Sequence, residues 1–445
     1  MSQSHLNRRG FLTRSLTASS AVLSASAIGG FHVNPVRAAA ADSPNGRLNL
    51  ACVGAAGRAA ANIEGCKSEN IIAIADVDAQ SLGGGVAKYK GARGYRDFRV
   101  MLEKEADKID AVLVGTPDHT HAPAAAMAMR MNKHVYCEKP LAHTVYETRV
   151  LSDLAKSNQL VTQMGNQIHA GSNYRRVVEL VQAGAIGAVS EVHVWVPVDY
   201  SGGKYTTGTP VPANLDWDLW LGPAVERPYS EGVHPFHWRR FWDYGSGGLG
   251  DFGCHYMDLP HWALDLRAPD TIAARGPEVD PVSPPNWVIV DYQYPQRGEL
   301  PPVKMTWYDG GKRPEKLAEL TDAQGQPLDW RSGVLFVGSE GMLIADYGRH
   351  LLLPTGQFAD YQRPEPTIPD SIGHHAEWLE AIRSGGGPTT SNFDYAGALT
   401  EAVILGVVAY RSGETLQWNA KDLKVTNSEA AQHLLHKEYR KGWEL

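Results

Sequence analysis

The chain has 445 residues, of which 43% are hydrophobic and 20% charged, and its formal net charge is −7 at pH 7. This length is sufficient for two or more domains with cores of their own, and the composition is that of an ordinary globular protein. Because the net charge is negative and no basic stretch stands out, we do not expect nucleic acid as a partner.

The first residues have the pattern of an export signal. Residues 7–12 read NRRGFL, a twin-arginine pattern, and the Ala- and Ser-rich run after it is too short and too mildly apolar to span a bilayer. We predict a Tat signal in residues 1–38, a linker in residues 39–46, a periplasmic location and no stable membrane insertion. The Tat route carries folded proteins, which suits a protein that takes up a cofactor before export.

Residues 47–165 alternate between strands and helices, as in a doubly wound parallel sheet of the Rossmann type. Leu48–Val53 is an apolar strand that runs into a glycine-containing turn, and Ile71–Ala75 is a second strand that ends at Asp76. Asp76 lies 22 residues after Gly54, the separation at which an acid binds the ribose of adenosine. An acid at this position repels a 2′-phosphate, so the sequence favours NAD over NADP.

The glycine motif after the first strand is incomplete. Of the three glycines in a full fingerprint only Gly54 is present, while Ala56 and Ala59 take the third and sixth positions and Gly57 is added between them. Ala56 places a methyl group where the backbone approaches a pyrophosphate, which puts the cofactor affinity in question. We still predict contacts to the cofactor from Gly54, Ala56, Gly57, Arg58 and Asp76.

Residues 110–142 contain a strand–helix–strand unit that brings polar side chains together. Ala111–Gly115 and His134–Cys137 read as strands, and the helix His121–Asn132 lies between them. Such a unit makes the strands parallel, and ligands bind beyond the carboxyl ends of parallel strands. One crevice therefore receives the residues that follow the two strands: Thr116, Pro117, Asp118, His119, His121, Glu138 and Lys139.

The remaining elements divide the chain into two domains near Gly165. Before it we predict helices over Phe98–Ala106 and Thr144–Ser157, the second with a capping box, and a strand over Leu160–Met164. Residues 166–445 then form an α+β domain on an open, mostly antiparallel sheet with a long Trp-rich insertion. Its predicted elements are helices Asn173–Gln182, His374–Ser384 and Tyr395–Ser412, strands Ser190–Val198, Val288–Tyr294, Val303–Tyr308, Gly333–Val337 and Gly341–Asp346, and the insertion Asp216–Leu266.

The four cysteines show no metal-binding or disulfide pattern. Cys52 and Cys137 fall in predicted buried strands, and Cys66 and Cys254 form no C-x-x-C pair with them or with each other. We therefore expect four buried free thiols.

A second segment with chemical character begins at a run of glycines and continues as a helix. Asp251, His255 and Asp258 stand at i, i+4 and i+7, so we expect them on one helical face. A histidine between two carboxylates has a raised pKa and suits proton transfer. The alternatives are a structural buried histidine or, more weakly supported, a metal site; because no further acid cluster accompanies the three residues, we predict no metal.

Two motifs together resemble the glucose–fructose oxidoreductase and inositol dehydrogenase family (Gfo/Idh/MocA): Glu138-Lys139-Pro140 and residues 248–258. Residues 116–121 are similar to the family's nicotinamide-side loop, although Asp118 stands where Asn is common. Residues 163–187, 216–223 and 234–243 resemble the exported, sugar-related branch.

The resemblance implies a set of functional residues. Lys139 is the implied catalytic lysine, His255 the general acid/base and Asp251 its partner. Further cofactor contacts are expected from Thr116, Pro117, His119, His121 and Glu138, and substrate contacts from Gln167, His237, Trp238, Arg239 and Asp258.

The predicted function is oxidation or reduction of a carbohydrate CH–OH group by an NAD(P)-dependent oxidoreductase. Outside the cytoplasm there is no free NAD pool, so we expect a retained cofactor that one sugar reduces and another reoxidises. One alternative is an NAD-dependent glycosidase that works by transient oxidation, elimination, water addition and re-reduction. A second alternative is a non-catalytic sugar-binding protein. The expected partners are a small carbohydrate and further copies of the chain, as a dimer or tetramer.

Overall fold

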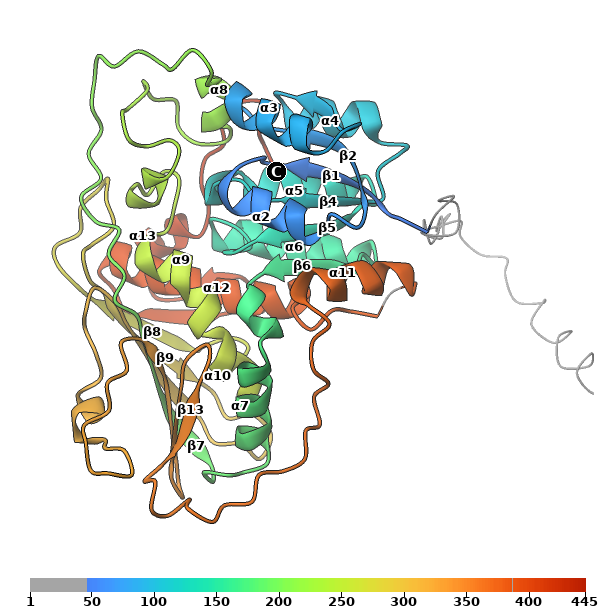
Figure 1. Cartoon of the computed structure of the whole chain (residues 1–445). Coiled ribbons are helices and arrows are strands. Elements are labelled where there is room, and N and C mark those ends of the chain that lie inside the picture. The colour runs from blue at the N-terminus through green and yellow to red at the C-terminus, as the bar shows by residue number, and fades with distance from the viewer. Residues whose placement is uncertain (1–45, 386) are drawn as a thin grey trace, which may run out of the picture. The chain divides into compact units, whose positions relative to one another are not determined.

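The computed structural model describes residues 46–385 and 387–445. The predicted export signal, residues 1–38, and residues 39–45 of the predicted linker lie outside the described residues. The described part of the chain contains two sheets, and Figure 1 shows the first in blue and cyan and the second in green, yellow and orange.

The first sheet confirms the predicted Rossmann domain. Its strand order is β3-β2-β1-β4-β5-β6, and each neighbouring pair is parallel. This order reverses direction between β1 and β4, which places a ligand crevice beyond the carboxyl ends of those strands. The strands are β1 (Asn49–Val53), β2 (Asn70–Ala75), β3 (Arg93–Tyr95), β4 (Ala111–Val114), β5 (His134–Glu138) and β6 (Thr162–Gly165).

Helices connect these strands and pack on the sheet. The capping box predicted for the fifth of them is confirmed: the Thr144 hydroxyl accepts the N–H of Glu147, and the Glu147 carboxylate accepts the N–H of Thr144. The helices are α2 (Gly57–Gly65), α3 (Ala79–Lys88), α4 (Phe98–Glu105), α5 (His121–Arg130) and α6 (Val145–Ser157).

Helix α3 and strand β3 were not predicted from the sequence. Three consecutive glycines, residues 83–85, lie inside α3 and weaken its helical signal. The helix nevertheless begins at a strong cap, because the Asp78 carboxylate accepts the N–H groups of Gln80 and Ser81.

The second sheet is open and mostly antiparallel, as predicted. Within the described residues it has the order β13-β12-β11-β7-β10-β9-β8-β14-β15, and β7 pairs in parallel with β10 while the other neighbours run antiparallel. The strands β8, β13, β14 and β15 were not predicted. The strands are β7 (Val189–Trp195), β8 (Thr271–Arg275), β9 (Ile289–Tyr294), β10 (Val303–Tyr308), β11 (Gly333–Gly338), β12 (Met342–Ala345), β13 (His350–Leu353), β14 (Leu416–Asn419) and β15 (Lys424–Val425).

A long buried helix, α12 (Phe393–Ser412), lies between the two sheets and packs on α6, α9 and β8. It is the one described helix long and apolar enough to cross a membrane, and 83% of its apolar window is buried inside the protein. The remaining helices of this part are α7 (Ser172–Gln182), α8 (Trp217–Leu221), α9 (Gly247–Tyr256), α10 (Asp258–Ala263), α11 (His374–Arg383) and α13 (Glu429–Leu434). Cys52, Cys66, Cys137 and Cys254 are buried free thiols, as expected.

Candidate active site

The turn after β1 shows how the incomplete glycine motif is accommodated. Gly54 has φ +99°, and a Cβ there would lie 3.0 Å from the Cβ of Ala59 and 3.1 Å from the carbonyl oxygen of Gly115. A Cβ on Gly115 would in turn lie 2.8 Å from the Cβ of Ala59. The alanine at the sixth position of the fingerprint therefore fits because the residue directly after β4 is a glycine.

The beginning of α2 is open to an anion. Ala56, Gly57 and Arg58 are exposed, and no side-chain cap among the described residues occupies the N–H groups of the first turn. Such free N–H groups at a helix N-terminus bind phosphate groups well. Ala56 is exposed on the surface of this turn.

Asp76 stands at the end of β2 beside this turn. Its carboxylate accepts the N–H of Ala55 at 2.8 Å and that of Asp78 at 2.9 Å. Burial raises the pKa of the Asp76 carboxyl, while these two backbone bonds oppose the rise. Each oxygen keeps a lone pair, so the half-buried carboxylate can also accept a hydroxyl of a ribose.

Three side chains from distant parts of the chain converge on Asp251 in α9. The Lys139 ammonium bonds its carboxylate and lies 2.7 Å from its backbone carbonyl oxygen. Arg239 Nε is 3.1 Å from Asp251 Oδ1, and the Tyr200 hydroxyl donates to Oδ2 at 2.9 Å. Burial raises the pKa of Asp251, but the charges of Lys139 and Arg239 outweigh it and hold the pKa well below its usual range.

His255 lies one turn after Asp251, and the charge of Lys139 acts on its imidazole. Burial lowers the pKa of His255 to about 3, and the positive charge of Lys139 acts in the same direction. The prediction of a raised pKa is therefore wrong, because the carboxylate of Asp251 is bonded to Lys139, Arg239 and Tyr200 and not to the imidazole. His255 is neutral near pH 7, and its buried Nδ1 has no partner among the described residues.

Asp258 does not flank His255, which corrects a second expectation. Helix α9 ends at Tyr256, and Asp258 begins α10. Pro260 has no N–H to give to the carbonyl of Tyr256, so the helical ladder is interrupted here. The buried Asp258 carboxylate instead lies 2.9 Å from His169 Nδ1 and accepts the hydroxyl of Tyr395 at 2.7 Å, so its predicted contact with substrate is not supported by its position.

Asp118 completes the charged cluster around Lys139. Its side chain is buried, and burial raises its pKa to about 7 even though the charges of Arg239 and Lys139 oppose the rise. A carboxyl with this pKa changes its protonation state near neutral pH, where Asp251 stays ionised and His255 stays neutral.

Two residues that were predicted to contact the cofactor, His119 and His121, are instead buried against backbone carbonyl groups. His119 is fully buried, and its Nε2 lies 3.0 Å from the carbonyl oxygen of Trp220 in the Trp-rich insertion. His121 is also fully buried, with Nδ1 and Nε2 each 2.8 Å from the carbonyl oxygens of Pro140 and Thr116. The first side chain anchors the insertion and the second ties the ends of β4 and β5 together, so neither ring faces the crevice.

Glu138 and Gln167 lie side by side next to Lys139. The Glu138 Oε1 accepts the Nε2 of Gln167 at 2.7 Å and the Nδ2 of Asn62 at 2.8 Å, and burial raises the pKa of this carboxyl. The amide of Gln167 also donates to the Tyr136 hydroxyl at 2.9 Å. Gln167 therefore holds Glu138 in place.

The other predicted substrate residues of the insertion differ in exposure. His237 is exposed, while Trp238 is 5% exposed and belongs to a hydrophobic cluster inside the insertion. The guanidinium of Arg239 lies 4.1 Å from the centre of the Trp238 ring. Trp238 thus orients Arg239 toward Asp251. Sequence reasoning missed Tyr200, because it stands in an irregular segment without periodicity.

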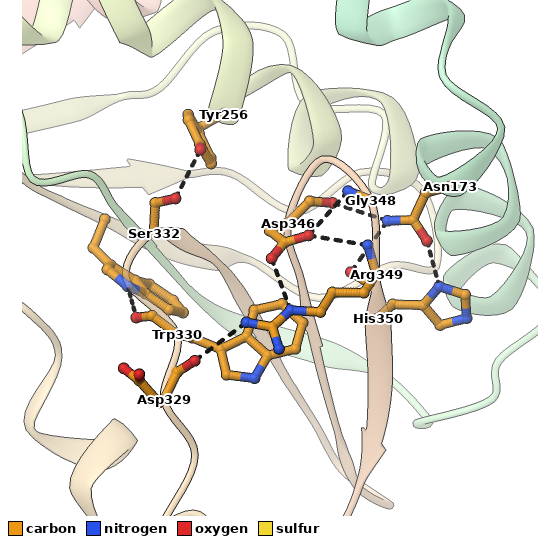
Figure 2. A network of polar contacts seen from close by, with 10 residues as sticks. Asn173, Tyr256, Asp329, Trp330, Ser332, Asp346, Gly348, Arg349 and His350 are labelled. Atoms are coloured by element: carbon orange, nitrogen blue, oxygen red, sulfur yellow. Dashed lines mark hydrogen bonds and ion pairs between the residues drawn. The ribbon is translucent and has the colours of Figure 1, made fainter.

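A hairpin of the second sheet closes the site on the side of His255. The ring of Tyr347, in the turn between β12 and β13, has its centre 6.2 Å from that of His255. Figure 2 shows the network that fixes this turn: Asn173 donates to the carbonyl oxygens of Asp346 at 2.8 Å and Arg349 at 3.1 Å, and Arg349 donates to that of Asp329 at 3.2 Å.

The fold and the site define a two-domain protein with a dinucleotide-binding sheet and a lysine–aspartate–histidine group at its edge. Residues 48–166 match the model of an oxidoreductase family with an NAD-binding Rossmann fold, and residues 173–300 match that of the same family's C-terminal alpha/beta domain. The chain belongs to this family, Gfo/Idh/MocA.

Individual curated relatives are similar to this chain only over a short segment. Inositol 2-dehydrogenase of Rubrobacter xylanophilus is 33% identical over 119 residues, which cover 26% of this chain and 33% of the relative. The matched segment thus spans about a third of the length of the curated relatives.

Solved structures show the same fold over most of the chain. The WlbA dehydrogenase of Bordetella pertussis, in complex with NADH and UDP-GlcNAcA, has a TM-score of 0.59 at 15% identity and covers 84% of this chain and 99% of its own. The aldose–aldose oxidoreductase of Caulobacter crescentus has a TM-score of 0.55 at 17% identity and covers 84% and 100%. At these identities the likeness establishes the fold alone.

The residues present fit NAD. The crevice has an uncapped helix start at Gly57, the acid Asp76 at the ribose position, and a buried Thr116 Oγ1 without a partner in the described part of the chain. By contrast, no group of three or more His, Cys, Asp or Glu side chains among the described residues is arranged to hold a metal ion.

Proposed function

We propose that the protein is an NAD-dependent oxidoreductase that acts on a CH–OH group of a sugar or sugar derivative and retains its cofactor. The observation that carries the proposal is the convergence of Lys139, Asp251 and His255 at the edge of a sheet whose family binds NAD. NAD is favoured over NADP, because the carboxylate of Asp76 repels a 2′-phosphate and the nearby Arg96 guanidinium is already bonded to backbone carbonyls.

Each residue of the site has a role that follows from its charge. Bound NAD supplies the hydride acceptor for the carbon that is oxidised. The Lys139 ammonium stabilises negative charge on the reacting oxygen, and neutral His255 accepts the hydroxyl proton. Asp251 holds Lys139, and the same carboxylate forms an ion pair with Arg239 and accepts the hydroxyl of Tyr200. The charge of Lys139 lowers the basicity of His255, and ionisation of Asp118 offsets part of that charge.

The proposed setting is the periplasm, after Tat export. The twin-arginine pattern of residues 7–12 supports it. Since a periplasmic enzyme cannot exchange NADH with a free pool, the cofactor must be reoxidised on the enzyme by a second sugar. A sugar-nucleotide complex in one structural relative and the aldose–aldose activity named for another agree with a sugar substrate. Association into a homo-oligomer remains a prediction.

A single-turnover experiment tests the proposal. The purified protein, loaded with NAD, is mixed with a panel of aldoses, inositols and uronic acids, and NADH is followed by its absorbance. We expect a burst of NADH with at least one compound, and its loss in Lys139→Met with NAD still bound. No burst with any compound, together with release of the aglycone from a chromogenic glycoside without net NADH, identifies the redox glycosidase instead. Sugar binding without either reaction identifies the binding protein.

A further inference from the structure

The segment between β7 and α9 runs back from the second sheet to the Rossmann domain. We call residues 199–246 the strap. In Figure 1 the strap is the green segment that rises from the second sheet and places α8 beside α3. It has a hydrophobic core of its own, made of Leu215, Trp217, Trp220, Leu221, Ala224, Tyr229, Val233, Trp238, Phe241 and Tyr244.

One end of the strap is fixed to the loop after β2. The Asp216 N–H donates to the carbonyl of Val77 at 3.0 Å, and the carbonyl of Asn214 accepts the N–H of Ala79 at 2.8 Å. The Asn214 amide also donates to Asp78 Oδ2 at 2.9 Å. Val77, Asp78 and Ala79 follow Asp76 directly, so the strap is bonded to the loop that carries the acid at the ribose position.

Arg96 and Val77 strengthen this anchor. The Arg96 guanidinium donates to the carbonyl of Val77, and to that of Asn214 at 3.3 Å, so it joins the loop after β2 to the strap. The Val77 side chain packs against the hydrophobic core of the strap. Opening this end therefore breaks several hydrogen bonds and exposes apolar surface.

A second group of strap contacts reaches the residues after β4 and the Asp251 carboxylate. The carbonyl of Trp220 is bonded to His119, two residues after Pro117, and Arg239 and Tyr200 reach Asp251. The strap is therefore bonded at one place to the loop that follows Asp76 and at another to His119 and Asp251.

We infer that the strap retains the cofactor: NAD leaves only when residues 199–246 detach from the loop after β2. The inference rests on the proposed function, because it names the part of this chain that prevents exchange. Exchange is then limited by a local opening of the strap, whose free energy is set by the bonds of Asn214 and Arg96 and by the packing of Val77.

The test measures the exchange of bound NAD for isotope-labelled NAD by native mass spectrometry. The variant Asn214→Ala/Arg96→Ala removes the side-chain bonds of the anchor and leaves Asp76 in place. The variant Asn173→Ala/Arg349→Ala is the matched control, because it removes the same two residue types from the hairpin network of Figure 2, which contacts no residue of the loop after β2. Thermal unfolding verifies that each variant is folded, and Asn214→Ala alone replaces the double variant if that variant does not fold.

We expect slow exchange in the wild type and the control, and exchange at least about tenfold faster in the anchor variant, since each lost hydrogen bond to a charged group alters an equilibrium by about that factor or more. Equal exchange rates in the wild type and the folded anchor variant overturn the inference and leave the proposed function intact. If the wild type does not bind labelled NAD at all, the proposed function fails as well.

Discussion

Asp118 offers a test in which stability and activity respond to pH in opposite directions. Burial raises the pKa of this carboxyl from its usual 3.8 to about 7, so the folded protein binds a proton that the unfolded chain has already lost in the range between the two values. The contribution of the protonated carboxyl to the free energy of unfolding is fully present below about pH 4 and is lost as the pH rises through about 7. The variant Asp118→Asn keeps a neutral side chain at every pH and escapes this loss.

The size of this loss of stability follows from the pKa of Asp118. A difference of about three pKa units, at about 1.4 kcal/mol each, sets an upper value of about 4 kcal/mol for the loss above neutral pH. We therefore expect the free energy of unfolding of Asp118→Asn to equal that of the wild type near about pH 4 and to exceed it by about 1–4 kcal/mol near about pH 8. Urea unfolding at a series of pH values, followed by tryptophan fluorescence, measures this difference.

The activity of the same variant gives the second half of the test. The charge of Lys139 lowers the basicity of His255, and ionised Asp118 offsets part of that charge, so single-turnover NADH formation in the wild type should increase with pH through about 7. In Asp118→Asn the increase of the rate with pH disappears, and the rate stays near its low-pH value. A stability difference that does not depend on pH, or a variant that keeps this increase, refutes the assignment of this titration to Asp118.

Three further substitutions test the packing and the charges of the site. Lys139→Met breaks a buried ion pair and should cost about 3 kcal/mol in urea unfolding and at least about a hundredfold in single-turnover rate, while NAD stays bound; an unchanged rate would remove Lys139 from the mechanism. Gly115→Ala places a Cβ 2.8 Å from that of Ala59 and should lower the unfolding free energy by about 1–3 kcal/mol. Because that Cβ would also lie 2.9 Å from the Cα of residue 59, adding Ala59→Gly should restore at most part of the lost stability, and full recovery would show that the backbone contact is not part of the cause. Tyr200→Phe removes one donor to the Asp251 carboxylate, and we expect a loss of about 1–2 kcal/mol in the same assay, with an unchanged stability arguing against the bond.

The Rossmann sheet and the position of Lys139 at its edge were predictable because their signals are local. Strands such as Ala111–Val114 are short apolar runs that end at a turn residue, and Lys139 follows one of them directly. The open antiparallel sheet was predictable for its longer strands, and the capping box at Thr144 was readable from residue spacing alone.

The surroundings of His255 and the contacts of the strap depended on residues that are far apart in the chain. Helical spacing placed Asp251 and Asp258 on either side of His255, but the break before Asp258 and the ion pair from Lys139 cannot be read from spacing. The strap has no periodicity, so neither its bond from Tyr200 to Asp251 nor its burial of His119 had a signal in the sequence.

The central claim is that this crevice holds NAD and does not release it between turnovers. The most direct measurement is a mass spectrum of the protein as purified, first under native conditions and then after gentle denaturation. We predict one NAD(H) for each chain under native conditions and its release as the intact dinucleotide on denaturation. A native mass equal to that of the polypeptide alone, with no uptake of added NAD, contradicts the account.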